Sequence, residues 1–159
     1  MKITVLCVGR VKEKFFTQAI AEYEKRLGRY CQIQIVEVAD EKTPEKASEK
    51  EEIQIKEKEG ERLLSKMKDD MYVIALDLHG KQPDSVALAQ KIERLTTYQT
   101  SHIAFVIGGS LGLSQAVLQR ADESVSFSNL TFPHQLMRVI LLEQIYRSFR
   151  INAGEPYHK

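Results

Sequence analysis

Short apolar runs alternate with helical patterns along the whole chain, and this alternation restricts the fold more than any other feature of the sequence. Runs rich in β-branched side chains predict strands at residues 2–9, 33–38, 71–78, 103–107 and 123–127. Apolar residues at helical spacing predict helices at about residues 14–29, within 41–68, and at about 83–98, 114–120 and 134–149. This order predicts an α/β fold with a mainly parallel sheet flanked by helices. Without linkers or repeats, residues 1–159 are expected to form one domain.

Charge and cysteine content exclude several functional classes. The net charge of +1 does not indicate a general nucleic-acid binder, although a local basic surface remains open. Cys7 and Cys31 have no metal-ligand spacing, so we expect reduced thiols and no metal site. No apolar segment is long enough to span a bilayer, and the first residues do not resemble a signal peptide. We therefore expect a cytoplasmic protein without a membrane partner.

Three segments follow predicted strands at the edge of the sheet where ligands usually bind. In parallel α/β sheets, ligands lie at the carboxyl ends of the strands. The candidate segments are residues 76–80, 107–112 and 127–133. We expect these three segments to meet at one edge of the sheet.

The middle segment, Ile107-Gly-Gly-Ser-Leu-Gly112, is hereafter the glycine loop, and its residues suggest either phosphate binding or a nucleophile. Phosphate binding is weakly supported, because neither the GxxxxGK[ST] nor the GxGxxG pattern is present. The loop does match GxSxG at Ser110, and Asp122 and His134 follow in the order of an α/β-hydrolase triad. No oxyanion-loop sequence accompanies them, however, and Ser114 is the better helix cap. A hydrolase is therefore disfavoured.

A third interpretation treats the glycines as space for a flat ligand. Small residues let the main chain approach a group such as adenine, whose edge can bond main-chain atoms. The alternative is that the glycines only form a tight turn. The loop by itself does not decide between these two interpretations.

The end of the chain carries a specific resemblance. Residues 127–138, 142–147 and 154–159, together with 107–114 and 76–81, resemble the SPOUT-class ribosomal RNA large subunit methyltransferase H family. The resemblance implies a trefoil knot in the C-terminal segment and a homodimer that binds S-adenosylmethionine in the knot. It also implies methylation of N3 of pseudouridine 1915 in helix 69 of 23S ribosomal RNA, on assembled ribosomes. A non-catalytic cofactor-binding or ribosome-assembly factor on the same fold is the alternative.

The resemblance also assigns cofactor contacts to the three strand ends. Leu76 and Gly108 would border S-adenosylmethionine, and residues 127–132 would wrap its adenine and methionine parts. The residues expected to bind the cofactor are thus Leu76, Gly108, Phe127, Ser128, Asn129, Leu130, Thr131 and Phe132.

The C-terminal tail is expected to supply the catalytic groups. A sulfonium methyl group is already activated, so neither a protein nucleophile nor a metal is needed. The proton on N3 must leave, and a base or a cation would help. Arg150, Tyr157 and His158 are the candidates, lying over the cofactor of a partner subunit; a frayed, solvated end is the alternative.

Other charged and aromatic residues receive weaker assignments. His134 is expected to cap or pack the last helix, and His79 and His102 to lie in loops without partners. Leu142, Ile145, Tyr146 and Phe149 are expected to face the core or a dimer interface. Two sets of cations are candidates for phosphate contacts, with exposed helix faces as the alternative: Arg10, Lys12 and Lys14, and Arg138, Arg147, Arg150 and Lys159.

Overall fold

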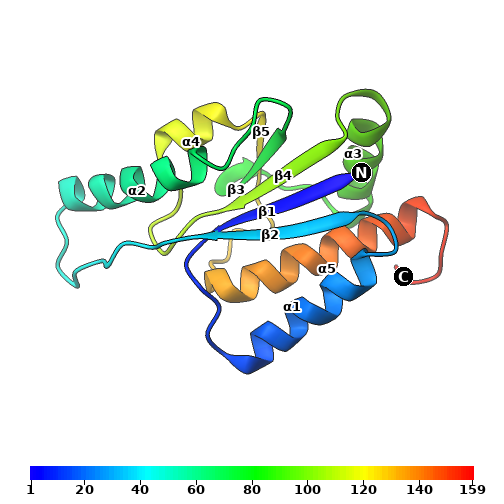
Figure 1. The fold of residues 1–159 in the computed structure, drawn as a ribbon, viewed down its shortest axis with the longest axis horizontal. Helices are drawn as coiled ribbons and strands as arrows, with labels where there is room; N and C mark the ends of the chain where they lie inside the picture. The colour runs from blue at the N-terminus through cyan, green and yellow to red at the C-terminus, as the bar shows by residue number, and fades with distance from the viewer.

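The structure, a computed structural model, describes residues 1–159 and contains five strands and five helices in strict alternation (Figure 1). The strands are β1 (Lys2–Val8), β2 (Gln32–Val38), β3 (Tyr72–Lys81), β4 (His102–Ile107) and β5 (Glu123–Val125). The helices are α1 (Lys14–Leu27), α2 (Glu49–Leu64), α3 (Ser85–Tyr98), α4 (Gln115–Arg120) and α5 (His134–Asn152). The predicted α/β class is confirmed, although α5 and β3 each run three residues beyond their predicted ends. No helix combines the length and apolarity needed to cross a bilayer.

All five strands form one parallel sheet in the order β2-β1-β4-β3-β5. The neighbouring inner strands β1 and β4 are almost completely buried, and their sequences are correspondingly apolar except for Lys2, Thr4 and His102. The edge strand β2 instead alternates, with Gln32 and Gln34 exposed. This difference follows from position, because a central strand of such a sheet has helices over both faces.

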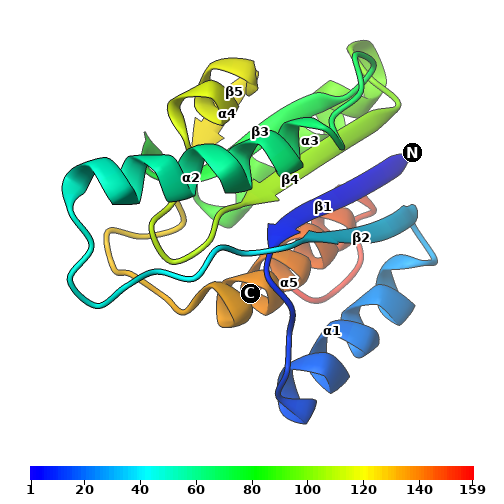
Figure 2. The same ribbon diagram turned by 60° about the vertical axis from the view of Figure 1, so that its left-hand side comes forward.

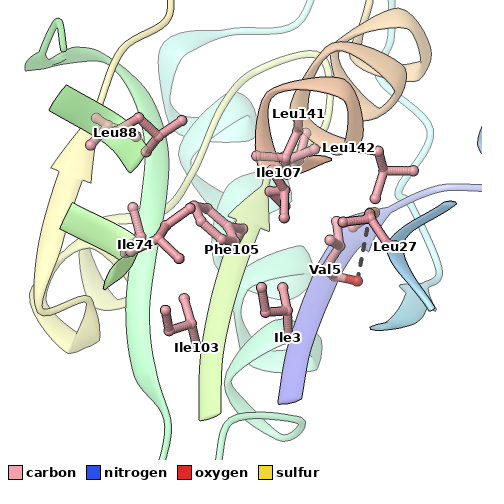
Figure 3. Packing of buried hydrophobic residues seen from close by; sticks show 14 of the residues in the cluster. Ile3, Val5, Leu27, Ile74, Leu88, Ile103, Phe105, Ile107, Leu141 and Leu142 are labelled. Carbon is pink, nitrogen blue, oxygen red and sulfur yellow. Dashed lines mark hydrogen bonds between the residues drawn. The ribbon is translucent and has the colours of Figure 1, made fainter. Parts of the chain in front are cut away.

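Helices cover the two faces of the sheet unequally (Figure 2). α1, α3 and α5 pack on one face, and α2 and α4 pack on the other. Successive side chains of β1 point to opposite faces, so Ile3 and Val5 join the larger core while Leu6 joins the smaller. Figure 3 shows the larger core, where Phe105 of β4 lies between side chains of β3 and of α5.

Side-chain caps begin the helices that flank the carboxyl edge of the sheet. Ser48 and Glu51 form a reciprocal capping box at the start of α2. Ser114 accepts a hydrogen bond from the Val117 N–H at 3.3 Å and caps α4. The predicted cap at Ser114 is confirmed, and it fixes the point at which the glycine loop ends.

The prediction that His79 and His102 lie in loops is wrong, because His79 lies within β3 and His102 within β4. His102 begins β4, is only 6% exposed, and its Nε2 lies 2.7 Å from Thr4 Oγ1. The two residues come from neighbouring strands and share a buried hydrogen bond at the amino edge of the sheet. His102 is therefore a structural residue with a polar partner.

Candidate functional site

A cavity of about 980 Å³ lies at the carboxyl edge of the sheet. Residues 76–79, 107–115, 125–128 and 130–134 line it, with contributions from α2 and from Met137 of α5. The predicted meeting of the three strand-end segments is therefore confirmed. Every residue expected to bind a cofactor lines the cavity except Asn129, whose Oδ1 accepts a hydrogen bond from Gln82 Nε2 at 2.6 Å.

The glycine loop closes tightly on itself. The Gly112 N–H donates to the Gly109 carbonyl at 3.1 Å, and Gly112 has a φ of +91°. A methyl group on Gly108 would lie 2.8 Å from the carbonyl carbon of Gly112. The turn itself thus requires glycine at positions 108 and 112, which is the tight-turn interpretation, and the turn forms one wall of the cavity.

The segment after β5 forms the facing wall and is shaped by two serines. Ser126 Oγ donates to the Ser128 carbonyl at 3.0 Å, and Ser128 Oγ accepts from the Leu130 N–H at 3.0 Å. A methyl group on Gly80 would lie 2.7 Å from the main chain of Val125, so β3 and β5 approach closely beneath this wall. These contacts hold residues 126–130 in a compact bend.

Two main-chain donors of these walls have no partner within the chain. Gly108 is buried, yet its N–H donates no hydrogen bond to another group of the protein. The N–H of the half-buried Phe127 is likewise unpaired. Because buried donors are normally satisfied, the Gly108 N–H in particular is suited to hydrogen bonding a ligand in the cavity.

Ser110 is not part of a hydrolase triad. Ser110 and His134 both line the cavity, but Asp122 lies at the opposite, amino edge of the sheet. There its Oδ2 accepts a hydrogen bond from the Val73 N–H at 2.8 Å and lies 3.6 Å from Arg120. The nucleophile interpretation of the glycine loop is therefore wrong.

The C-terminal tail is folded against α5, away from the cavity. Tyr157 Oη donates to Glu143 Oε1 at 3.1 Å, and its ring meets the Tyr146 ring edge-on at 5.0 Å. Arg147 lies 4.7 Å above the Tyr157 ring and 3.0 Å from His158 Nδ1. The tail is thus packed rather than frayed, and none of Arg150, Tyr157 and His158 lines the cavity of its own subunit.

Two of the predicted catalytic groups have shifted pKa values. Burial and the bond to Glu143 raise the pKa of Tyr157 to about 12, so its phenol stays protonated at neutral pH. The hydrogen bond to Tyr30 raises the pKa of Arg150, which also pairs with Glu155. In this arrangement Tyr157 is a hydrogen-bond donor and Arg150 a permanent cation.

Comparison with known proteins now identifies the family. Residues 1–158 match the family described as "Predicted SPOUT methyltransferase". The chain belongs to the SPOUT methyltransferase family. It is 65% identical over 159 residues to the Ribosomal RNA large subunit methyltransferase H of Bifidobacterium adolescentis, and 62% identical to that of Clostridium novyi, covering all of both chains in each case.

A solved structure supports the fold alone. The probable methylase family protein from Haemophilus influenzae Rd KW20 matches with a TM-score of 0.52 and 14% identity, over 99% of this chain and 70% of that chain. At such low identity the match concerns architecture only. It agrees with the parallel sheet and its flanking helices.

A SPOUT methyltransferase implies S-adenosylmethionine as methyl donor, and the cavity fits an adenosyl group. Its walls include the apolar side chains of Leu76, Ile107, Phe127 and Phe132, which suit a flat base. The unpaired main-chain donors described above suit the polar edge of that base. A volume of about 980 Å³ is large enough for a nucleoside derivative.

Histidine and arginine residues of α5 differ from their predicted roles. Arg138 is only 2% exposed; its Nη1 lies 2.5 Å from Glu37 and its Nη2 donates to the Gly9 carbonyl at 3.3 Å. The prediction that Arg138 contacts phosphate is therefore wrong, because a buried ion pair uses its guanidinium. His134 makes no capping hydrogen bond, so that half of its prediction is wrong; its Nε2 instead lies near Gly9, 3.8 Å from where a methyl group on Gly9 would be, and the residue lines the cavity.

Sequence reasoning gave α2 no role, yet α2 contributes to the site. Ile53, Lys56 and Glu57 line the cavity, and Glu59 is buried beneath the glycine loop. The sequence held one signal for this contact. Gly60 interrupts a helix interior, where glycine is unfavourable unless another element approaches closely.

Proposed function

We propose that this SPOUT methyltransferase transfers the methyl group of S-adenosylmethionine to N3 of pseudouridine 1915 in helix 69 of 23S ribosomal RNA. The observation that carries the proposal is 60–65% identity, over the full length, to relatives named Ribosomal RNA large subunit methyltransferase H. The cavity supports it, because an apolar pocket with unpaired main-chain donors suits the methyl donor. We further propose a cytoplasmic homodimer that acts on assembled ribosomes, with the C-terminal segment threaded as a trefoil knot.

The cofactor is held by the strand ends in this proposal. Leu76, Gly108 and residues 127–132 bind it, mainly through main-chain groups, and the apolar walls exclude water from the sulfonium. The bound cofactor supplies a methyl group that needs no further activation. The remaining task of the protein is to align N3 with that methyl group and to accept the N3 proton.

The tail of the second subunit supplies the groups for that proton in this proposal. Within one subunit the tail lies on α5 and does not border the cavity, so a second copy must bring Tyr157 and His158 to it. The neutral phenol of Tyr157 would donate a hydrogen bond to the base. His158 would accept the proton, and Arg150 would stabilise the negative charge that develops on the ring.

Labelled S-adenosylmethionine and ribosomes that lack the modification test the function. The expected result is label in large-subunit RNA, and mass spectrometry should find one added methyl group in the helix 69 fragment. Label elsewhere in the RNA would overturn the proposed nucleotide. Cofactor binding without any transfer would instead support a non-catalytic ribosome factor.

A further inference from the structure

Helix α2 contacts the glycine loop through two consecutive residues, Glu59 and Gly60. Most of α2 is charged and exposed, but Glu59 is only 5% exposed. A carboxylate in such a position is unusual, because acidic side chains are almost never fully buried without a partner. Its contacts therefore require an explanation beyond helix packing.

The Glu59 carboxylate lies directly against the main chain of Gly109. A methyl group on Gly109 would lie 2.9 Å from Glu59 Oε1 and 3.2 Å from Oε2. Any side chain at position 109 would thus push against this carboxylate. Glu59 forms the support behind the loop, whose other side faces the cavity.

The same carboxylate is fixed from a second direction. Glu59 Oε2 accepts a hydrogen bond from the Glu41 N–H at 3.0 Å. One turn along α2, Arg62 donates to the Ala39 carbonyl at 2.9 Å and to Glu41 Oε1 at 2.8 Å. The segment after β2 is therefore tied to α2, and it holds the Glu59 side chain in one orientation.

Gly60 contacts the chain two residues beyond the glycine loop. A methyl group on Gly60 would clash with Ser114 Oγ, the atom that caps α4. The helix thus touches the loop at Gly109 and the chain just after it at Ser114. These two contacts lie on either side of the turn at Gly112, whose main chain forms one wall of the cavity.

Burial disfavours the charged form of the Glu59 carboxylate. Burial raises the pKa of Glu59, and the Glu41 N–H and Arg62 only partly oppose that shift. A leucine would fill the same space without that penalty but would offer no acceptor to the Glu41 N–H. An acceptor that bonds the Glu41 N–H and is thereby held in van der Waals contact with Gly109 is what distinguishes glutamate here.

We propose that Glu59 is a positioning residue for the methyl donor: its carboxylate sets the conformation of the glycine loop and thereby the affinity of the cavity for S-adenosylmethionine. This inference rests on the proposed function, in which that cofactor occupies the cavity. Glu59 acts through the loop and does not touch the ligand. It therefore affects cofactor binding and has no part in the methyl-transfer step.

The first experiment compares three variants of the full chain by calorimetric titration with S-adenosylmethionine and with S-adenosylhomocysteine. Glu59→Ala is expected to raise the Kd for both ligands about ten-fold, because contacts that orient a binding loop contribute on this scale. Glu59→Gln keeps an acceptor for the Glu41 N–H and is expected to stay within about three-fold of wild type. The matched control is Glu61→Gln, an exposed residue of the same helix, which should leave the Kd unchanged.

Steady-state kinetics separate positioning from general damage. Glu59→Ala should raise the KM for S-adenosylmethionine while kcat at saturating cofactor stays within about two-fold. A thermal melt of each variant shows whether the fold is intact at the assay temperature. A lower melting temperature with an unchanged Kd would overturn the proposal, because Glu59 would then only stabilise the fold.

A double-mutant cycle tests the contact itself and remains informative if Glu59→Ala folds poorly. Gly109→Ala alone should weaken cofactor binding about ten-fold, because its methyl group meets the carboxylate. In the Glu59→Ala background, where the carboxylate is absent, the same change should cost about two-fold. Equal costs in both backgrounds would overturn the inference, whereas wild-type protein that binds neither ligand would refute the proposed function itself.

Discussion

The cavity and the C-terminal tail lie at opposite ends of α5 and differ in how their polar groups are used (Figure 1). In the cavity, main-chain donors such as the Gly108 N–H have no partner in the chain. By contrast, Tyr157 and His158 of the tail are paired with Glu143 and Arg147 of α5, and Arg150 of α5 is paired with Glu155 of the tail. The cavity therefore has donors that are free to bind a ligand. The polar side chains of the tail already have hydrogen-bond partners, and they would have to exchange these partners to contact a substrate.

The length of α5 shows why one subunit does not bring the two regions together. His134 lines the cavity at the start of the helix, whereas the tail folds back so that Tyr157 bonds Glu143, near the middle of the helix. At 1.5 Å per residue His134 and Glu143 are about 14 Å apart along the helix. The tail therefore does not border the cavity of its own subunit, and this separation is the reason to propose a composite site.

Removal of residues 157–159 is expected to have the largest effect. Methyl transfer should fall at least about 100-fold, because the proton acceptor is lost while cofactor binding is retained. Filter binding with labelled S-adenosylmethionine and a ribosome methylation assay measure the two quantities separately. Tyr98→Ala, an exposed tyrosine of α3, is the control and should change neither. Unchanged turnover after the deletion would remove the tail from the mechanism.

Gly108→Val should weaken cofactor binding and leave the tail intact, which is the opposite of the effect of the deletion. Its side chain would begin 2.8 Å from the Gly112 carbonyl carbon, so the glycine loop must shift and cofactor affinity should fall about 30-fold or more. Equilibrium titration with S-adenosylhomocysteine measures this loss. The tail contacts on α5 should survive, and the near-ultraviolet dichroism of the tyrosine cluster should report them unchanged.

Mixing the tail-deleted protein with Gly108→Val, at a cofactor concentration well below the Kd of Gly108→Val, tests whether the cavity and the tail of one site come from different subunits. If the cavity of one subunit works with the tail of its partner, a mixed dimer contains one intact composite site. After subunit exchange, activity should recover to about a quarter of wild type, as random pairing of two defective chains predicts. No recovery, with mixed dimers detected by mass spectrometry, would mean that cavity and tail act within one subunit.

Tyr157→Phe is expected to have a smaller effect than the deletion. The variant keeps the ring contact with Tyr146 but loses the hydroxyl that bonds Glu143. Because the pKa of Tyr157 is raised to about 12, its phenol does not ionise during an assay between pH 6 and 9. Transfer should fall about ten-fold with no change in the shape of the pH–rate profile. Loss of an ionisation from that profile would show Tyr157 acting as the base.

The features that the sequence could predict are those encoded locally. Strand–helix alternation and the gathering of strand ends follow from periodicity and from the geometry of parallel sheets. Arg138 was mistaken for a surface cation because its partner, Glu37, is 101 residues away in the chain. Glu59 was overlooked for a similar reason, since nothing local to a charged helix indicates that one of its carboxylates lies beneath Gly109. Polar contacts between residues far apart in the chain do not change the spacing of apolar residues, so that spacing does not predict them.

The smallest expected effect is a pH dependence of folding stability caused by His102, which lies at the amino edge of the sheet, away from the cavity and the tail. Burial lowers the pKa of His102 below its ordinary value of 6.5, and Lys2 adds to the shift. As the pH falls below 6.5, the unfolded chain therefore binds a proton that the native state does not, and stability decreases. Between pH 7.5 and 5.5, the loss should be about 1 kcal/mol or less, measured as a change in the urea midpoint.

His102→Gln isolates this contribution, because glutamine can still bond Thr4 but does not titrate. The acid-induced loss of stability should shrink in this variant, whereas His79→Gln, at an exposed position, should leave it intact. Cofactor affinity and methyl transfer should be unchanged in His102→Gln, since His102 lies at the edge of the sheet opposite the cavity. An equal pH dependence in wild type and His102→Gln would mean that His102 binds its proton equally well in the native and unfolded states and that other groups cause the acid sensitivity. A change in cofactor affinity would instead couple the two edges of the sheet, contrary to the separation that the fold indicates.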